Sequence, residues 1–346
     1  MAPRVLFVSN EPYFGRIGST NRQRLARAAA RAGWSVTYLE TIGFGVRPSG
    51  SQPDMSILHA RNLLPRAAQP RNRVFRQANQ WLTSKTLSDE SWDLVISYDP
   101  FSAPLVARLR YKKLVYDCVD AYEYQPQYAS LESSQMVKEA ELEVAHMADV
   151  RIATSQTLAR RRGIDWKQPV ALLEGAHEMS ATSISGRRNE GRRALYIGAF
   201  DSYKIDAAAL IEWLSSDSDR RLVMAGRQLA GADETLRDLL RHDRVAVREP
   251  VSGDQIKHLC EEADFGIVAL QRTPYNLYSF PLKTWDYMMN GVPVLASNAP
   301  ALHGISGVFN IRDEYLAAAA VDPQELVAVA ASHHVDERLR RLQELL

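Results

Sequence analysis

The chain has 346 residues, which is enough for two domains of ordinary size, and its 46% apolar content can fill two cores. A net charge of +1 argues against nucleic acid as a partner, and no apolar run approaches the ~20 residues of a membrane span. The two cysteines lie far apart without metal-ligand spacing, and no signal peptide precedes the first apolar run. We therefore expect free thiols, no metal site, and a location in the cytoplasm or on the inner face of the cell membrane.

The first half of the chain alternates short apolar runs with helical patterns, which predicts a domain built from βαβ units. Buried strands are expected at residues 5–9, 34–39, 93–97, 113–119, 150–155 and 170–173. Helices are expected at residues 20–32, 100–109 and 132–147. Residues 43–58 are rich in Gly, Ser and Pro and are expected to form a loop.

The loop after the first strand holds Gly15, Gly18 and Ser19. The two glycines have the wrong spacing for a dinucleotide fingerprint and the third glycine is missing, so we do not expect a dinucleotide-dependent dehydrogenase. The loop is either an ordinary turn or a place where backbone approaches a ligand.

Residues 60–83 combine arginines with aromatic and aliphatic side chains. This stretch belongs to a basic segment, because the first 85 residues hold thirteen Lys or Arg and only three acids. Such a pattern predicts either a contact with an anionic membrane surface or a solvated basic helix face.

A second α/β pattern follows a polar, turn-rich linker. Strands are expected at residues 194–198, 221–227, 245–247, 265–270 and 292–296. Asp206 and Asp322 are expected to cap helices. The predicted division is a first domain at 1–175, a linker at 176–193, a second domain at 194–321 and a terminal helical segment at 322–346.

Residues 279–297 combine a loop, a short helix and a buried strand. Pro281 suits a helix start, where Lys283 would add a full charge to free N–H groups that attract phosphate. Asp286 shares a helix face with Lys283 and could accept from two ribose hydroxyls, with Tyr287 beside it. The pattern predicts a nucleotide-diphosphate site or, alternatively, a surface Lys–Asp pair.

The Pro281-Leu282-Lys283 opening and the closing Gly291-Val292-Pro293-Val294 resemble the donor-nucleotide motif of GT-B glycosyltransferases. The chain is most similar to the glucuronosyltransferase of xanthan assembly and to the teichuronic-acid-type transferases. The resemblance implies two Rossmann-like, doubly wound parallel-sheet domains facing a cleft, with a C-terminal helix that crosses back to the first domain. It covers nearly the whole chain.

The resemblance also implies a reaction and its site. A sugar would pass from a nucleotide-diphosphate donor to a glycan or lipid-linked acceptor hydroxyl, as a hexosyl- or glucuronosyl-type transfer without a metal or other cofactor. The lysine at the Lys283 position would contact the diphosphate. From their places at strand ends or in the short helix and its start, we also expect donor contacts from Pro281, Leu282, Asp286, Tyr287, Gly198, Lys204 and Arg227. The acceptor side would use Gly15, Gly18, Ser19 and Tyr122 of the first domain. Asp217-Ser218-Asp219 follows a helix and is expected to be a surface loop rather than a metal site.

Asp120 is the expected general base. It follows a predicted strand, and the carboxyl ends of parallel strands are where α/β proteins place function. Residues 113–120 are also similar to the strand of the xanthan enzyme that ends in its proposed base. Asp117, Tyr122 and Glu123 are alternatives, and Asp120 could instead cap the next turn.

Retaining relatives carry two glutamates, and here their positions hold Tyr278 and Asp286. The missing first glutamate favours inversion at the anomeric carbon. Two other functions stay open: a GT-B-fold nucleotide-sugar epimerase, and a non-catalytic module that binds nucleotides or carbohydrates.

Overall fold

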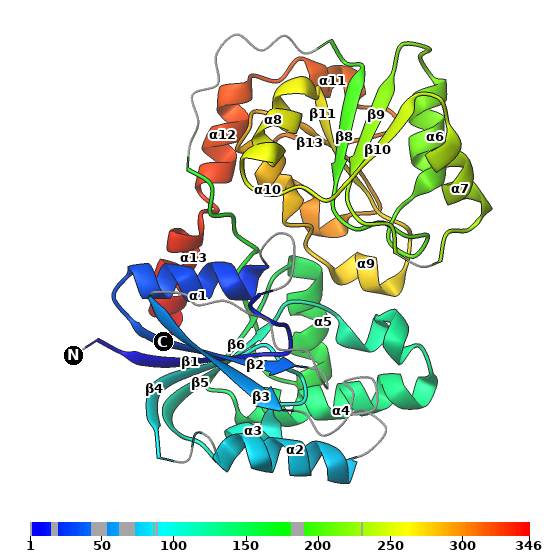
Figure 1. Cartoon of the computed structure of the whole chain (residues 1–346). Coiled ribbons are helices and arrows are strands. Elements are labelled where there is room, and N and C mark those ends of the chain that lie inside the picture. The colour runs from blue at the N-terminus through cyan, green and yellow to red at the C-terminus, as the bar shows by residue number, and fades with distance from the viewer. Residues whose placement is uncertain are drawn as a thin grey trace. The chain divides into compact units, whose positions relative to one another are not determined.

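The computed structural model describes residues 2–14, 20–42, 54–61, 73–85, 87, 89–180, 190–229 and 231–346. The chain forms two compact units (Figure 1). The first unit comprises Met1–Glu174 and Arg338–Leu346, and the second comprises Gly175–Glu337. The chain thus returns to the first unit at Arg338, whereas the sequence predicted a return from residue 322.

A parallel sheet of seven strands forms the first unit, in the order β3-β2-β1-β4-β5-β6-β7. Its strands are β1 Arg4–Ser9, β2 Ser35–Ile42, β3 Met55–Arg61, β4 Ser91–Ser97, β5 Arg110–Cys118, β6 Val150–Ala153 and β7 Ala171–Leu172. Its helices are α1 Asn21–Arg31, α2 Arg73–Lys85, α3 Ala103–Val106, α4 Leu131–Met147 and α5 Gln156–Trp166, with a 3-10 turn, η2, at Tyr122–Tyr124. Two expectations were wrong: β3 lies partly in the predicted loop, and the helix predicted at 100–109 is a single turn.

Helices cover both faces of this sheet. In Figure 1, α1 and the end of α13 (Val335–Leu345) lie on one face, and α2, α3 and α4 lie on the other. The strand β5 therefore sends alternate side chains to different helices. Asp117 contacts Arg338 of α13, whereas Tyr116 and Cys118 contact Glu141 of α4.

The second unit is a parallel sheet of six strands in the order β10-β9-β8-β11-β12-β13. Its strands are β8 Arg193–Ile197, β9 Arg221–Ala225, β10 Val245–Arg248, β11 Phe265–Ala269, β12 Val294–Ser297 and β13 Val308–Asn310. Its helices are α6 Ala207–Ser215, α7 Glu234–Arg241, α8 Asp254–Glu262, α9 Pro274–Tyr278, α10 Lys283–Met288, α11 Tyr315–Ala319 and α12 Pro323–Ala331.

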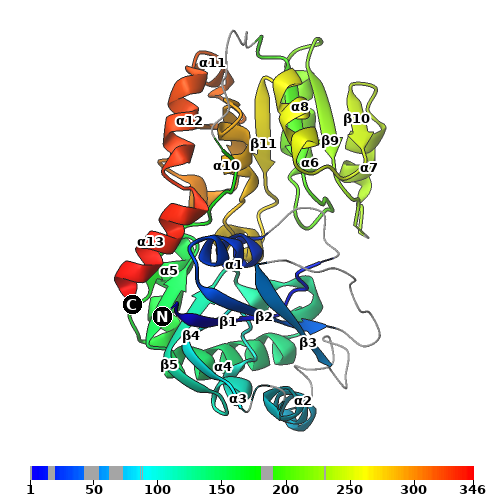
Figure 2. The ribbon, with the colours of Figure 1, turned by 60° about the vertical axis from the view of Figure 1, so that its left-hand side comes forward.

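This second sheet has an apolar core on each face. Tyr196 of β8 belongs to the core under α6 and α7, while its neighbour Leu195 belongs to the core under α8, α10 and α12. Figure 2 shows these two sets of helices on opposite sides of the sheet. Because α12 packs on α10, the predicted terminal segment begins inside the second unit.

Side chains cap several helices as the sequence predicted. The carboxylate of Asp206 accepts from the N–H of Ala209 at 3.0 Å, and that of Asp322 accepts from Gln324 at 2.9 Å. These caps satisfy N–H groups that the first helical turn leaves free. The helices therefore begin at positions fixed by local sequence.

Candidate functional site

The strand order of the second sheet reverses between β8 and β11, because the chain runs from β8 to β10 on one side and from β11 to β13 on the other. Open α/β sheets bind ligands at the carboxyl ends of strands at such a point. Lys283 lies there, with its ammonium nitrogen 3.4 Å from the centroid of the Tyr196 ring on β8. Its helix begins at Lys283 rather than at Pro281 and has six residues.

Lys283 lies close to a second ammonium group. Burial lowers the pKa of Lys283 well below its ordinary value, and the positive charge of Lys204 lowers it further. Lys204 is fixed in the turn after β8, where its N–H donates to Oδ1 of Asp201 at 2.8 Å. The structure thus brings two predicted donor residues together, and a bound diphosphate would relieve their repulsion.

Two glycines let the ends of β8 and β9 approach each other. Gly198 has a φ of 122°, and its N–H donates to the carbonyl of Ala225 at 2.9 Å. A Cβ on Gly226 would lie 1.9 Å from the carbonyl oxygen of Gly198, so only glycine fits there. Arg227 follows and is exposed. Contact of Gly198 and Arg227 with a donor stays a prediction.

Asp286 and Tyr287 have different environments. Asp286 is half-buried, and its backbone carbonyl accepts from Nδ2 of Asn290 at 2.7 Å. Tyr287 is fully buried, its ring packs over Gly266, and its hydroxyl accepts from the N–H of Ile197 at 2.8 Å. The Tyr287 side chain therefore belongs to the core, and its predicted contact with the nucleotide stays a prediction.

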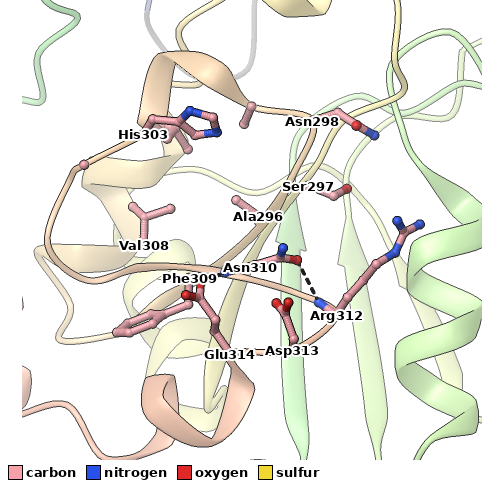
Figure 3. Close-up of a pocket in the computed structure, with 13 residues that line it drawn as sticks. Ala296, Ser297, Asn298, His303, Val308, Phe309, Asn310, Arg312, Asp313 and Glu314 are labelled. Atoms are coloured by element: carbon pink, nitrogen blue, oxygen red, sulfur yellow. Dashed lines mark hydrogen bonds between the residues drawn. The ribbon is translucent and has the colours of Figure 1, made fainter.

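A polar hollow of about 500 Å³ lies at the carboxyl ends of β12 and β13 (Figure 3). Its lining includes Ser297, Asn298, His303, Arg312, Asp313 and Glu314. Part of this lining is structural: Nδ2 of Asn298 donates to Asp206 at 3.1 Å, and Nε of Arg312 donates to Glu212 at 3.1 Å. Lys283 and the other predicted donor residues do not line this hollow.

Asp120 lies two residues beyond the end of β5 in the first unit and is half-buried. It is electrostatically coupled to the buried guanidinium of Arg22. Burial acts to lower the pKa of Arg22, but Glu11, Tyr122 and Asp120 raise it well above its ordinary value. Nη1 of Arg22 lies 2.6 Å from Oε2 of Glu11. A permanent positive charge therefore acts on the candidate base.

The alternatives to Asp120 are all occupied in the core. Asp117 is fully buried and pairs with Nη2 of Arg338 at 2.7 Å. Glu123 pairs with Nη2 of Arg162 at 2.7 Å. Tyr122 is 1% exposed, and its predicted contact with an acceptor stays a prediction. These contacts leave Asp120 as the base candidate at this strand end.

The remaining acceptor residues, Gly15, Gly18 and Ser19, lie outside the described residues, so their roles stay predictions. Within the residues that the structure describes, no group of three or more His, Cys, Asp or Glu could hold a metal. Asp217-Ser218-Asp219 lies in an exposed turn, as predicted, and Asp219 is 3.4 Å from Arg192.

Sequence reasoning missed Arg22, Arg162 and Glu141, which are buried charged residues near the candidate base. In the sequence these three residues are indistinguishable from charged residues on the solvent-exposed face of a helix. Arg22 and Tyr122 are a hundred positions apart, so no local pattern could pair them.

No family model matches the chain. The chain is 25% identical over 213 residues to the putative teichuronic acid biosynthesis glycosyltransferase TuaH of Bacillus subtilis. That match covers 57% of this chain and 54% of the relative, which is about half of its length. The resemblance to teichuronic-acid-type transferases is thus confirmed, while the resemblance to the xanthan enzyme stays a prediction.

Solved structures are similar over nearly the whole chain. Sucrose-phosphate synthase of Thermosynechococcus elongatus matches 100% of this chain and 95% of its own, with a TM-score of 0.69 and 16% identity. Anabaena Alr3699/HepE in complex with UDP and glucose matches 99% of this chain and 98% of its own, with a TM-score of 0.68 and 14% identity. These similarities show that the two Rossmann-like domains have the GT-B fold, as predicted.

Proposed function

We propose that the protein is a glycosyltransferase that moves a sugar from a nucleotide-diphosphate donor to an acceptor hydroxyl with inversion. The observation that carries this proposal is the position of Lys283 over the Tyr196 ring at the reversal point of the second sheet, where the charge of Lys204 acts on it. The structural neighbour that is in complex with UDP and glucose supports a nucleotide sugar as the ligand.

In the proposed reaction the acceptor oxygen attacks the anomeric carbon, and the bond from that carbon to the diphosphate oxygen breaks. Lys283 and Lys204 would stabilise the negative charge that develops on the leaving diphosphate. Asp120 would take the proton of the acceptor hydroxyl. Asp286 would hold the ribose. The chain needs no metal for these steps, because the two ammonium groups supply the positive charge.

The test is nucleotide binding by the Lys283→Ala variant. We expect the affinity for UDP to fall by about 1.5–3 kcal/mol, the range for a hydrogen bond to a charged group. Calorimetry measures the change, and Lys257→Ala is the control because Lys257 is an exposed lysine of the same unit. Equal UDP affinity in wild type and Lys283→Ala would contradict the proposed donor site.

The product distinguishes this proposal from its two alternatives. A transferase supplied with a panel of nucleotide sugars releases nucleotide diphosphate slowly without an acceptor, and faster with one. An epimerase would release a free epimerised sugar or return an epimerised nucleotide sugar. A non-catalytic module would bind nucleotide and release nothing.

We further propose that the acceptor is lipid-linked and that α2, which covers the later part of the predicted segment 60–83, contacts the membrane. Residues 62–72 of that segment lie outside the described residues. Val74, Trp81 and Leu82 of α2 are exposed by 74%, 47% and 39%. Their spacing places them on one helix face, and the ammonium of Lys85 lies 5.2 Å from the centroid of the Trp81 ring. Apolar side chains beside cationic ones suit the interface of an anionic bilayer. No helix in the described part of the chain is long and apolar enough to cross a membrane.

A further inference from the structure

A buried arginine holds the turn that follows Asp120. Arg162 of α5 is 1% exposed, and its two Nη atoms donate to the two carboxylate oxygens of Glu123 at 2.9 and 2.7 Å. Glu123 belongs to η2, which begins two residues after Asp120. A bidentate pair of this kind fixes both the distance and the orientation of the carboxylate. The α5 helix therefore anchors this turn through one side chain.

Further contacts anchor the same turn beside Glu123. The hydroxyl of Tyr122 accepts from Nη2 of Arg22 at 2.6 Å and donates to the carbonyl of Tyr98 at 2.9 Å. On the other side, the hydroxyl of Thr154 donates to the carbonyl of Val119 at 3.0 Å. The backbone that carries Asp120 is thus held both before and after that residue.

Arg162 also contacts a second buried carboxylate. Its Nη2 lies 2.8 Å from Oε2 of Glu141, a fully buried residue of α4. Oε1 of Glu141 accepts from the Tyr116 hydroxyl at 2.8 Å and from Sγ of Cys118 at 3.3 Å. The Arg162 guanidinium therefore contacts two carboxylates, both of which are buried.

We propose that Arg162, Glu123 and Glu141 are positioning residues that hold Asp120 for proton abstraction. The inference rests on the proposed function, because it assigns a purpose to the geometry around the proposed base.

The ionisation of Glu141 changes the charge balance around Arg162. The groups that face it are Arg162 from α5, Glu123 from η2, and Tyr116 and Cys118 from β5; Asp165 of α5 is 3.6 Å from Nη1 of Arg162. Burial raises the pKa of Glu141 to about 7; the charge of Arg162 opposes this rise, and the negative charge of Glu123 adds to it.

For Glu123, burial acts to raise the pKa, but the hydrogen bonds and charge of Arg162 outweigh it and the pKa is lowered. When Glu141 is protonated, Arg162 is balanced by Glu123 alone. When Glu141 ionises, two buried carboxylates compete for Arg162, and the hold on the turn weakens.

The first experiment is the pH profile of kcat for wild type and Glu141→Gln. Glutamine keeps the shape and neutral charge of protonated glutamate but cannot ionise. We expect wild-type kcat to decrease as the pH rises through about 7, and Glu141→Gln to lack that decrease while it keeps the rise at lower pH that belongs to the base. The same decrease in both proteins would overturn the assignment of Glu141.

The second experiment separates positioning from binding. Glu123→Gln loses the bidentate charged contact, and we expect kcat to fall about 10–100-fold with an unchanged Kd for UDP, because small displacements of a reacting group cost that much. Asp165→Asn is the matched control, since Asp165 also lies near Arg162 but outside η2. A kcat of Glu123→Gln equal to that of the control would overturn the positioning role.

Hydrogen exchange of the wild-type protein tests the same inference without turnover. The amides of residues 119–125 are expected to have higher protection factors near pH 6 than near pH 8 in wild type, and equal ones in Glu141→Gln. Equal protection at both pH values in wild type would overturn the inference even for an active enzyme. Absence of transfer with every donor would instead contradict the proposed function. The hydrogen-exchange result would still test the positioning of the turn, because it does not depend on turnover.

Discussion

Lys283 carries an ammonium group that the unliganded protein destabilises. Burial and the neighbouring charge of Lys204 both lower the pKa of Lys283. An anion bound beside the two side chains would favour the protonated form and raise that pKa. Ligand binding at this site is therefore coupled to proton uptake.

This coupling gives a measurable prediction. We expect UDP binding to take up protons at a pH above the pKa of free Lys283 and above the second pKa of about 6 of a terminal phosphate. Calorimetry in buffers of different ionisation enthalpies measures the number of protons. The affinity for UDP should also increase as the pH falls through the pKa of free Lys283. Lys283→Ala should show no uptake, and uptake of the same size in that variant would assign the proton to another group.

Asp120 is the residue on which the proposed chemistry depends. A base aligned with the acceptor hydroxyl contributes about 10²–10⁴-fold in rate, so Asp120→Asn should lose most turnover and keep its UDP affinity. Steady-state kinetics with a competent acceptor measures the loss. Asp93→Asn is the control, because Asp93 lies on the neighbouring strand β4 and is partly exposed. Near-wild-type turnover of Asp120→Asn, or a product with the anomeric configuration of the donor, would exclude this role.

At the scale of single elements, α13 is attached to the first unit by a buried ion pair. Arg338 is 3% exposed, its Nη2 lies 2.7 Å from Oδ2 of Asp117, and its Nη1 donates to the carbonyls of Leu173 and Glu174. The Arg338 side chain thus connects α13 to β5 and to Leu173 and Glu174, where the segment Met1–Glu174 of the first unit ends. Removing it would leave the buried carboxylate of Asp117 uncompensated.

We expect Arg338→Met to destabilise the first unit by about 3–5 kcal/mol, the cost of breaking one partner of a buried pair. Arg340→Met is the control: Arg340 is exposed and pairs with Glu344, and surface pairs contribute about 0–1 kcal/mol. Hydrogen exchange of amides in β5 and β6 measures the free energy of unfolding of this unit. A loss as small as that of the control would show that the pair contributes no net stability.

The elements β3 and α10 show where local patterns failed. Prolines, serines and glycines before residue 55 predicted a loop, but Met55–Arg61 adds a strand to β2, because pairing with a neighbour outweighs local propensity. The sequence placed a helix start at Pro281, and the helix begins two residues later at Lys283. Helix boundaries depend on backbone contacts that the sequence specifies only to within a few residues.

At the scale of the whole molecule, the exposed face of α2 predicts attachment to a membrane. We expect the protein to co-sediment with vesicles that contain anionic lipid, and binding to decrease with added salt because surface charges are screened. The variant Val74→Ser/Trp81→Ser should bind at least about 10-fold more weakly, since burial of one large apolar side chain contributes about 1.5–3 kcal/mol.

Leu316→Ser is the control for vesicle binding, because Leu316 is 71% exposed but belongs to the second unit. Equal binding of this control and wild type would assign the effect to α2. Absence of co-sedimentation at low salt would exclude a membrane role for α2 and would favour a soluble acceptor.

The sequence by itself determined the α/β class, most strands and the donor motif around Lys283, because hydrophobic period, helix caps and turn residues act over a few positions. It also ranked Asp117 below Asp120 as a base candidate, because alternation along β5 separates their faces, and Asp117 is buried against Arg338. Gly226 lies in a predicted strand, but no local pattern indicates that its missing side chain leaves room for the Gly198 carbonyl.

The tertiary structure alone decided which polar side chains are available. Tyr287 and Tyr122 look like ligand contacts in the sequence, but each is buried with its hydroxyl bonded to distant backbone or side-chain groups. The charge of Lys204 acts on Lys283, and Arg162 forms ion pairs with two glutamates. In both cases the residues are far apart in the chain. A single sequence does not encode such contacts locally, because burial and charge compensation arise only when the strands and helices pack.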